Sequence, residues 1–126
     1  MATRDGEYLS NQQIRRRAPT FQWAGLLLND DGQWRLLAHY RHKCVHVFGT
    51  FGGAAVIFEG TNEDASLVTP THFVTLKDAT QADLVFTVDG MKEVHENPLY
   101  VRPRVAGGDG TTDVTVLLVC RDGGVK

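Results

Sequence analysis

Short runs in which apolar and polar residues alternate make up much of the chain after residue 40. The clearest are KCVHVFG (43–49), DLVFTVDG (83–90), LYVRPRV (99–105) and DVTVLLVC (113–120). Alternation with a period of two is the pattern of β-strands that have one buried face, and no segment shows a convincing helical period. We therefore predict an all-β protein. The residues predicted to line its core are Val45, Val47, Val56, Leu84, Phe86, Val88, Val101, Val105, Val114 and Val116.

Turn-forming sequences separate the predicted strands, at NDDG (29–32), GTFGG (49–53) and GGDGTT (107–112). Short strands at such spacing predict an antiparallel β-sandwich that is jelly-roll-like. GGDGTT is expected to be a hairpin turn. GTFGG lacks the Lys-Ser/Thr pair and the following helix of a phosphate-binding loop, so it is expected to be a hairpin or a hinge between two strands. Pro103 offers no N–H, which predicts that strand 99–105 is a sheet edge or carries a bulge.

The first 18 residues differ from the rest, because they are polar, lack periodicity and include the basic run Arg15, Arg16 and Arg17. This composition predicts an extended N-terminal arm over residues 1–18 that stays mobile until it meets a partner. Residues 19–126 are then a single β-sandwich domain. No apolar run approaches the ~20 residues of a membrane helix, and the first 17 residues lack the apolar core of a signal peptide.

Composition and charge exclude some functions and leave a structural role open. The 126 residues are 42% hydrophobic and 22% charged, and the formal net charge of −2 provides no overall field for nucleic acid or an anionic membrane. We therefore expect no membrane partner and no direct nucleic-acid partner. Cys44 and Cys120, the only two cysteines, are expected to be reduced thiols.

The sequence contains no strong catalytic or metal-binding motif. There is no G-x-S-x-G elbow, and acidic residues such as Glu63 and Asp64 fall in a turn-like stretch. His42, Cys44 and His46 would share one strand face, and these residue types bind zinc, but a zinc site usually draws ligands from two elements. A polar sheet face against another subunit is the preferred interpretation. We expect no enzymatic activity, no cofactor and no metal.

Several longer segments resemble a group of small tailed-bacteriophage virion proteins. The segments are VFGTFGGAAVIFEGTNED, FVTLKDA and FTVDGMKEVHENPLYVRPRVAGGDGTTDVTVLL, within about residues 44–120. These proteins are similar to capsid decoration, or cement, proteins with a β-sandwich or jelly-roll fold. The chain departs from their pattern at Thr61–Asp64, which stand in place of S-N-D-G, and at Phe73, which stands where a Trp is usual. An insertion-like ASLVTPTH precedes Phe73, so this loop is expected to be longer and differently shaped.

The resemblance implies a non-enzymatic virion protein that binds and stabilises the assembled head. The implied partner is the major capsid protein, the implied location is the capsid surface after assembly in the host cytoplasm, and a symmetric homo-oligomer is expected, a trimer first and a dimer second. Two alternatives remain open. One is a carbohydrate-binding module on the virion surface that uses exposed aromatics such as Trp23, Trp34 or Phe51; the other is a tail or neck component.

Candidate contact residues follow from position and residue type. They are Arg15, Arg16, Arg17, Phe51, Tyr100, Arg102 and Arg104. Tyr and Arg are enriched at interface hot spots, and the three on strand 99–105 should project from one face. Phe51 either folds back over the end of the sandwich or enters a partner's pocket. Contact is preferred because Gly52 and Gly53 let the turn approach another backbone closely.

Overall fold

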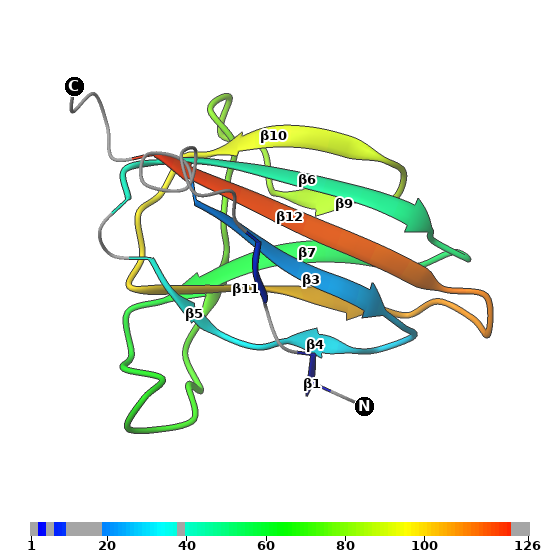
Figure 1. Ribbon diagram of the computed structural model, residues 1–126, viewed down its shortest axis with the longest axis horizontal. Helices are drawn as coiled ribbons and strands as arrows, with labels where there is room; N and C mark the ends of the chain where they lie inside the picture. The colour runs from blue at the N-terminus through cyan, green and yellow to red at the C-terminus, as the bar shows by residue number, and fades with distance from the viewer. Residues whose placement is uncertain (1–2, 5–6, 10–18, 38–39, 122–126) are drawn as a thin grey trace.

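Two β-sheets face each other and enclose the core of the protein (Figure 1). The computed structural model describes residues 3–4, 7–9, 19–37 and 40–121, and these residues form no helix. One sheet contains β1 (Thr3–Arg4), β4 (Asp31–Gly32), β5 (Arg35–Leu36), β7 (Ala55–Thr61), β8 (Val74–Thr75), β9 (Val85–Phe86) and β11 (Tyr100–Ala106). The other runs in the order β10 (Gly90–Val94), β6 (His42–Thr50), β12 (Asp113–Arg121), β3 (Thr20–Leu26) and β2 (Glu7–Leu9). The predicted all-β class is confirmed.

The strand order is that of a jelly roll. In the seven-stranded sheet β11 is central, with β7 on one side and β4 and β5 on the other, while β8 and β9 pair with the far side of β7. If β4 with β5 and β8 with β9 are each treated as one interrupted strand, each sheet has four main strands, as in a jelly roll. β1 and β2 add to the sheet edges, and among the described strands only the β1–β4 pair is parallel.

The core lies between the two inner faces and matches the alternation in the sequence. Nine of the ten predicted core residues are buried, around large side chains such as Trp23 and Phe58. The exception is Val88, which is 70% exposed, so its predicted inward position is wrong. The chain leaves the seven-stranded sheet after Phe86 and bends through residues 87–89 to enter β10 in the other sheet. The first half of the predicted strand 83–90 therefore pairs in the seven-stranded sheet, while residues 87–89 form a crossing.

The two glycine-rich turns join strands of different sheets, so the hairpin predicted for GGDGTT is wrong, and of the two alternatives for GTFGG the hinge between strands applies and the hairpin does not. GTFGG leads from β6 to β7 and GGDGTT from β11 to β12. The turns touch, because the Thr112 hydroxyl donates a hydrogen bond to the Phe51 carbonyl oxygen at 2.9 Å. Gly52 has φ of 57°, and a Cβ there would lie 2.4 Å from the Asp109 Oδ1 atom. Glycine is required at this position by both conformation and space.

Pro103 lies in a central strand, so the predicted edge position is wrong. β11 pairs with β7 without interruption from Tyr100 to Ala106. On its other side β11 meets β5 near Val101 and β4 near Arg104, and Pro103 falls between these two short pairings. Its missing N–H therefore faces a gap in the neighbouring strand. Gly32 makes room for the proline ring, since a Cβ there would lie 2.6 Å from the Pro103 Cδ atom.

Only part of the predicted N-terminal arm can be placed. β1 pairs with β4 at one sheet edge, and β2 pairs with β3 at the edge of the other sheet. Arg15, Arg16 and Arg17 lie outside the described residues. Cys44 and Cys120 are free, as predicted. None of the described segments forms a helix long and apolar enough to cross a membrane.

Candidate interaction surface on the seven-stranded sheet

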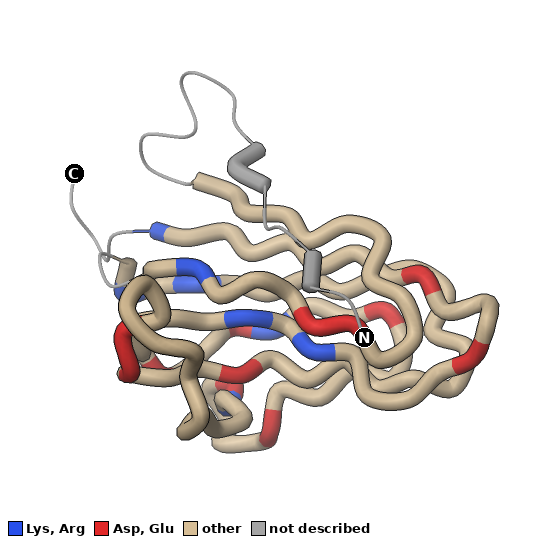
Figure 2. Tube along the Cα trace, turned by 90° about the horizontal axis from the view of Figure 1, so that it is seen from below, with Lys and Arg blue, Asp and Glu red and all other residues tan. Residues whose placement is uncertain are grey.

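The outer face of β11 carries the predicted arginines, and both bind a buried carboxylate. Glu59, on the neighbouring strand β7, is 1% exposed. It accepts hydrogen bonds from the Arg102 Nε atom at 2.8 Å and from the Arg104 Nε atom at 3.1 Å. The Arg102 Nη1 atom is also 3.7 Å from the Asp31 Oδ2 atom. Basic positions therefore lie beside acidic ones over this part of the fold (Figure 2).

Two aromatic rings hold the Arg102 guanidinium from segments that flank the sheet. Trp34 lies between β4 and β5, and Phe73 directly precedes β8. The Arg102 Cζ atom is 4.5 Å from the Trp34 ring centroid and 5.0 Å from the Phe73 ring centroid. We call Trp34, Glu59, Phe73, Arg102 and Arg104 the arginine clamp. Only 13% of the Arg102 side chain is exposed, so most of its donors serve the fold, and its role as a contact residue stays a prediction.

The loop between β7 and β8 is fixed at its base by side chains. Glu63 accepts hydrogen bonds from the backbone N–H groups of Thr71 at 2.7 Å and His72 at 3.1 Å, which close the loop. The Tyr100 hydroxyl donates to the Asp64 Oδ1 atom at 2.9 Å, tying the loop to β11. Hydrogen bonds, first from the His72 backbone, lower the pKa of Glu63. This arrangement is an Ω-type loop with a defined base.

This loop, residues 62–73, together with the first residue of β8, presents large apolar side chains to solvent. Leu67 is 80% exposed, Val68 55%, Phe73 37% and Val74 64%. Single exposed apolar residues are ordinary, but four within eight positions, next to a rigid base, are typical of a contact surface. Figure 1 shows the loop extending away from the sandwich at the lower left.

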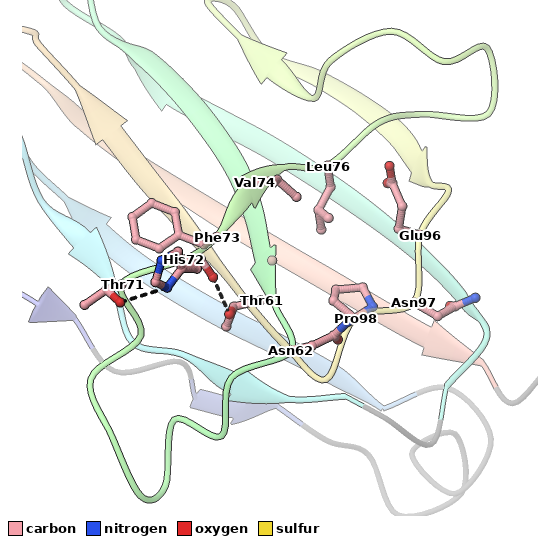
Figure 3. A pocket seen from close by; sticks show the side chains of 11 residues that line it. Thr61, Asn62, Thr71, His72, Phe73, Val74, Leu76, Glu96, Asn97 and Pro98 are labelled. Carbon is pink, nitrogen blue, oxygen red and sulfur yellow. Dashed lines mark hydrogen bonds between the residues drawn. The ribbon is translucent and has the colours of Figure 1, made fainter.

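A cavity of about 630 Å³ lies beside the loop (Figure 3). Its lining comes from the end of β7, from residues 71–76 and from the crossing at 96–98. Its polar groups are engaged within the protein: the Thr61 hydroxyl donates to the His72 carbonyl oxygen at 2.6 Å, and the Glu96 Oε1 atom accepts from the Lys77 backbone N–H at 2.8 Å. Within the described ranges, no group of three or more His, Cys, Asp and Glu side chains is placed to hold a metal ion.

The aromatic residues considered for contact or sugar binding have different environments. Trp23 is fully buried in the core and donates from Nε1 to the Gln33 carbonyl oxygen at 3.0 Å, so it cannot be an exposed sugar platform. Trp34 is covered by Arg102. Phe51 is half-buried and packs against the core, as expected if it folds back over the end of the sandwich. Its contact with a partner stays a prediction.

Sequence reasoning found the outward face of β11 but missed the groups that organise it. Glu59 is the one acidic residue in the apolar run AAVIFEG, and it pairs in register with Arg102. A carboxylate at an otherwise apolar position, beside a strand with alternating arginines, was the available signal for this ion pair. No sequence pattern indicated that Trp34 and Phe73 meet on Arg102.

The fold and this surface define a jelly-roll β-sandwich with a clamped, apolar-tipped loop. No protein-family model matches the chain, and no curated protein matches it. Among solved structures, the SPBc2 prophage-derived protein YomS is similar, with a TM-score of 0.58 and 14% identity over 82% of this chain and 93% of that chain. At this identity the likeness shows a shared fold. A cobalt(II) form of HppE in complex with Tris buffer has a TM-score of 0.45 and 11% identity over 91% of this chain and 51% of that chain, which is too low to support an argument.

Proposed function

We propose that this chain is a non-enzymatic bacteriophage virion structural protein, and more specifically a capsid decoration protein that binds the major capsid protein on the assembled head. Two observations support the virion role. Residues 44–120 resemble small tailed-phage virion proteins. The structure is also similar in fold to YomS, which is a prophage-derived protein.

The apolar-tipped loop is the observation that carries the decoration role. Leu67 and Val68 are exposed at its tip, while Glu63, Asp64 and the arginine clamp fix its base. A preorganised loop loses little conformational freedom on binding, and its exposed apolar side chains gain by leaving water. A protein that binds only the assembled shell stabilises that state by mass action, and several linked copies in a symmetric homo-oligomer multiply a modest affinity.

Co-sedimentation with heads assembled without the protein tests this proposal. The double variant Leu67→Ser/Val68→Ser should bind at least about tenfold more weakly than the unmodified protein, because interface hot spots contribute more than about 1 kcal/mol each. Leu27→Ser/Leu28→Ser is the matched control, since these two leucines are 41% and 44% exposed on the β3–β4 turn. The control should bind normally.

Three results would contradict the decoration role. The unmodified protein fails to bind heads; it binds a glycan array and not heads; or a map of whole virions places it in the tail or neck. Equal binding by both double variants would instead show that the loop is not the contact surface, while the head-binding role would stand.

A further inference from the structure

Lys43 places an amino group inside the sandwich, at the end opposite the glycine-rich turns. It lies near the start of β6 and is 2% exposed, between Val94 of β10 and Cys120 of β12 in the strand register. Its Nζ atom donates hydrogen bonds to the Tyr40 carbonyl oxygen at 3.2 Å and to the Asn97 Oδ1 atom at 2.5 Å. No carboxylate in the described part of the chain forms an ion pair with it.

The surroundings of Lys43 favour its neutral amine. Burial lowers the pKa of Lys43, against smaller opposite effects of Cys120 and Glu96. A desolvated lysine spends more of its time as the uncharged, nucleophilic form. Burial also raises the pKa of the Cys120 thiol to about 12, so this neighbour stays neutral and gives an ammonium group no counter-charge at neutral pH.

The segment that carries Asn97 is fixed on both sides. Before it, the His95 N–H donates to the Lys77 carbonyl oxygen at 2.8 Å, while Glu96 accepts from the Lys77 N–H. After it, the Leu99 N–H donates to the Asn62 Oδ1 atom at 2.9 Å. The amide of Asn97 is thus held against the amine in a fixed geometry, which is the arrangement that converts a slow bimolecular reaction into a feasible intramolecular one.

We propose that Lys43 and Asn97 join in an intramolecular isopeptide bond that the folded protein forms by itself. The Lys43 Nζ atom attacks the Asn97 side-chain carbonyl carbon and forms a new C–N bond. The bond from that carbon to Nδ2 breaks, and Nδ2 leaves as ammonia. An amine and a primary amide become a secondary amide and one ammonia, so atoms and electrons balance without an oxidant or a co-reactant.

The proton that Nζ loses must reach the departing nitrogen, and solvent can carry it there because Asn97 is exposed. Figure 3 shows the Asn97 amide nitrogen pointing away from the cavity residues, and Asn97 is exposed, so ammonia can leave to solvent.

The intact mass of the purified protein under denaturing conditions tests the proposal. The expected mass is lower than the sequence mass by one ammonia, and digestion should release a branched peptide that joins the segments around Lys43 and Asn97. A cyclic imide at asparagine also loses ammonia, but the residue after Asn97 is Pro98, whose nitrogen carries no hydrogen and cannot form it. The branched peptide distinguishes the link from an imide elsewhere.

Variants separate the link from a plain hydrogen bond. Lys43→Arg and Asn97→Ala should retain the full mass, while the control Asn29→Ala should still lose one ammonia. If unmodified protein, folded and incubated at pH 8–9 for days, keeps its full mass and gives no branched peptide, the proposal is wrong and Lys43 is only a hydrogen-bonded core lysine.

Discussion

Replacing Arg102 with alanine should destabilise the protein strongly, although the residue lies on the outer face of a sheet. The substitution removes one of the two hydrogen-bonded cations from Glu59, a carboxylate that is 1% exposed. It also removes the guanidinium from between the rings of Trp34 and Phe73. The loss is therefore a buried charge left with one of its two cations, together with lost packing, and not a surface change.

The size of the effect follows from these contacts. Removing one partner of a buried ion pair costs about 3–5 kcal/mol. The Arg104 Nε atom remains 3.1 Å from the Glu59 Oε1 atom and still balances part of the charge. We therefore take the lower end of this range as the cost of losing the Arg102–Glu59 ion pair. Loss of the two cation–π contacts adds about 0.5–1 kcal/mol each. A total near 4 kcal/mol should lower the melting temperature by roughly 15 °C in a domain of this size.

Urea unfolding monitored by tryptophan fluorescence and circular dichroism measures this change. The control is Lys77→Ala, because Lys77 and its partner Asp83 are 41% and 58% exposed at an Nζ–Oδ1 distance of 2.6 Å. An exposed ion pair contributes about 1 kcal/mol or less, despite its short distance. If Arg102→Ala costs no more than Lys77→Ala, the buried carboxylate does not depend on Arg102 and our account of the clamp fails.

Three further substitutions test the core and the acid stability. Phe86→Ala should lower the free energy of unfolding by about 3–5 kcal/mol, because Phe86 is 4% exposed. Val88→Ala should change it by less than about 0.5 kcal/mol, because Val88 is 70% exposed. Equal costs in urea unfolding would contradict the observed crossing at 87–89. The Thr80 hydroxyl, followed by the Ala82 N–H, lowers the pKa of Asp78 to about 2. Because this folded-state pKa lies below the usual value, the stabilisation is complete above about pH 4 and is lost as the pH falls towards 2. Asp78→Asn should therefore be less stable than the unmodified protein at pH 7 and should lose less stability between pH 4 and 2; parallel stability curves would rule this out.

Local alternation predicted the strands and the core well, but not how the strands are assigned to sheets. The pattern around Val45 and Val47 and along DVTVLLVC reports which side chains face inward, and burial confirms it. It carries no information on whether the next strand pairs with the previous one. In a jelly roll most consecutive strands lie in opposite sheets, so the turns at 49–53 and 107–112 resembled hairpins but are crossings.

The organisation of the outer face depends on contacts between distant parts of the chain. Alternation placed Arg102 on the outward side of β11, but Glu59 is 43 positions away and lies within an otherwise apolar run. The rings of Trp34 and Phe73 reach the arginine from loops on either side of the sheet. Periodicity cannot indicate such a meeting, because the meeting depends on strand order and on how the 62–73 loop returns to the sheet.

Lys43 shows what the same periodicity could have revealed. It precedes Val45 by two positions and therefore shares the inward face of β6, although the residue type suggests solvent. A charged lysine at such a position is costly, and an apolar residue of similar size would avoid this cost. Its hydrogen bonds to Tyr40 and Asn97 offset only part of the cost, because both acceptors are uncharged oxygens. An isopeptide bond would convert the amine into a neutral amide and remove the charge permanently. It would also tie β6 of one sheet to the crossing that leads into β11 of the other, at the end of the sandwich that the glycine-rich turns do not close.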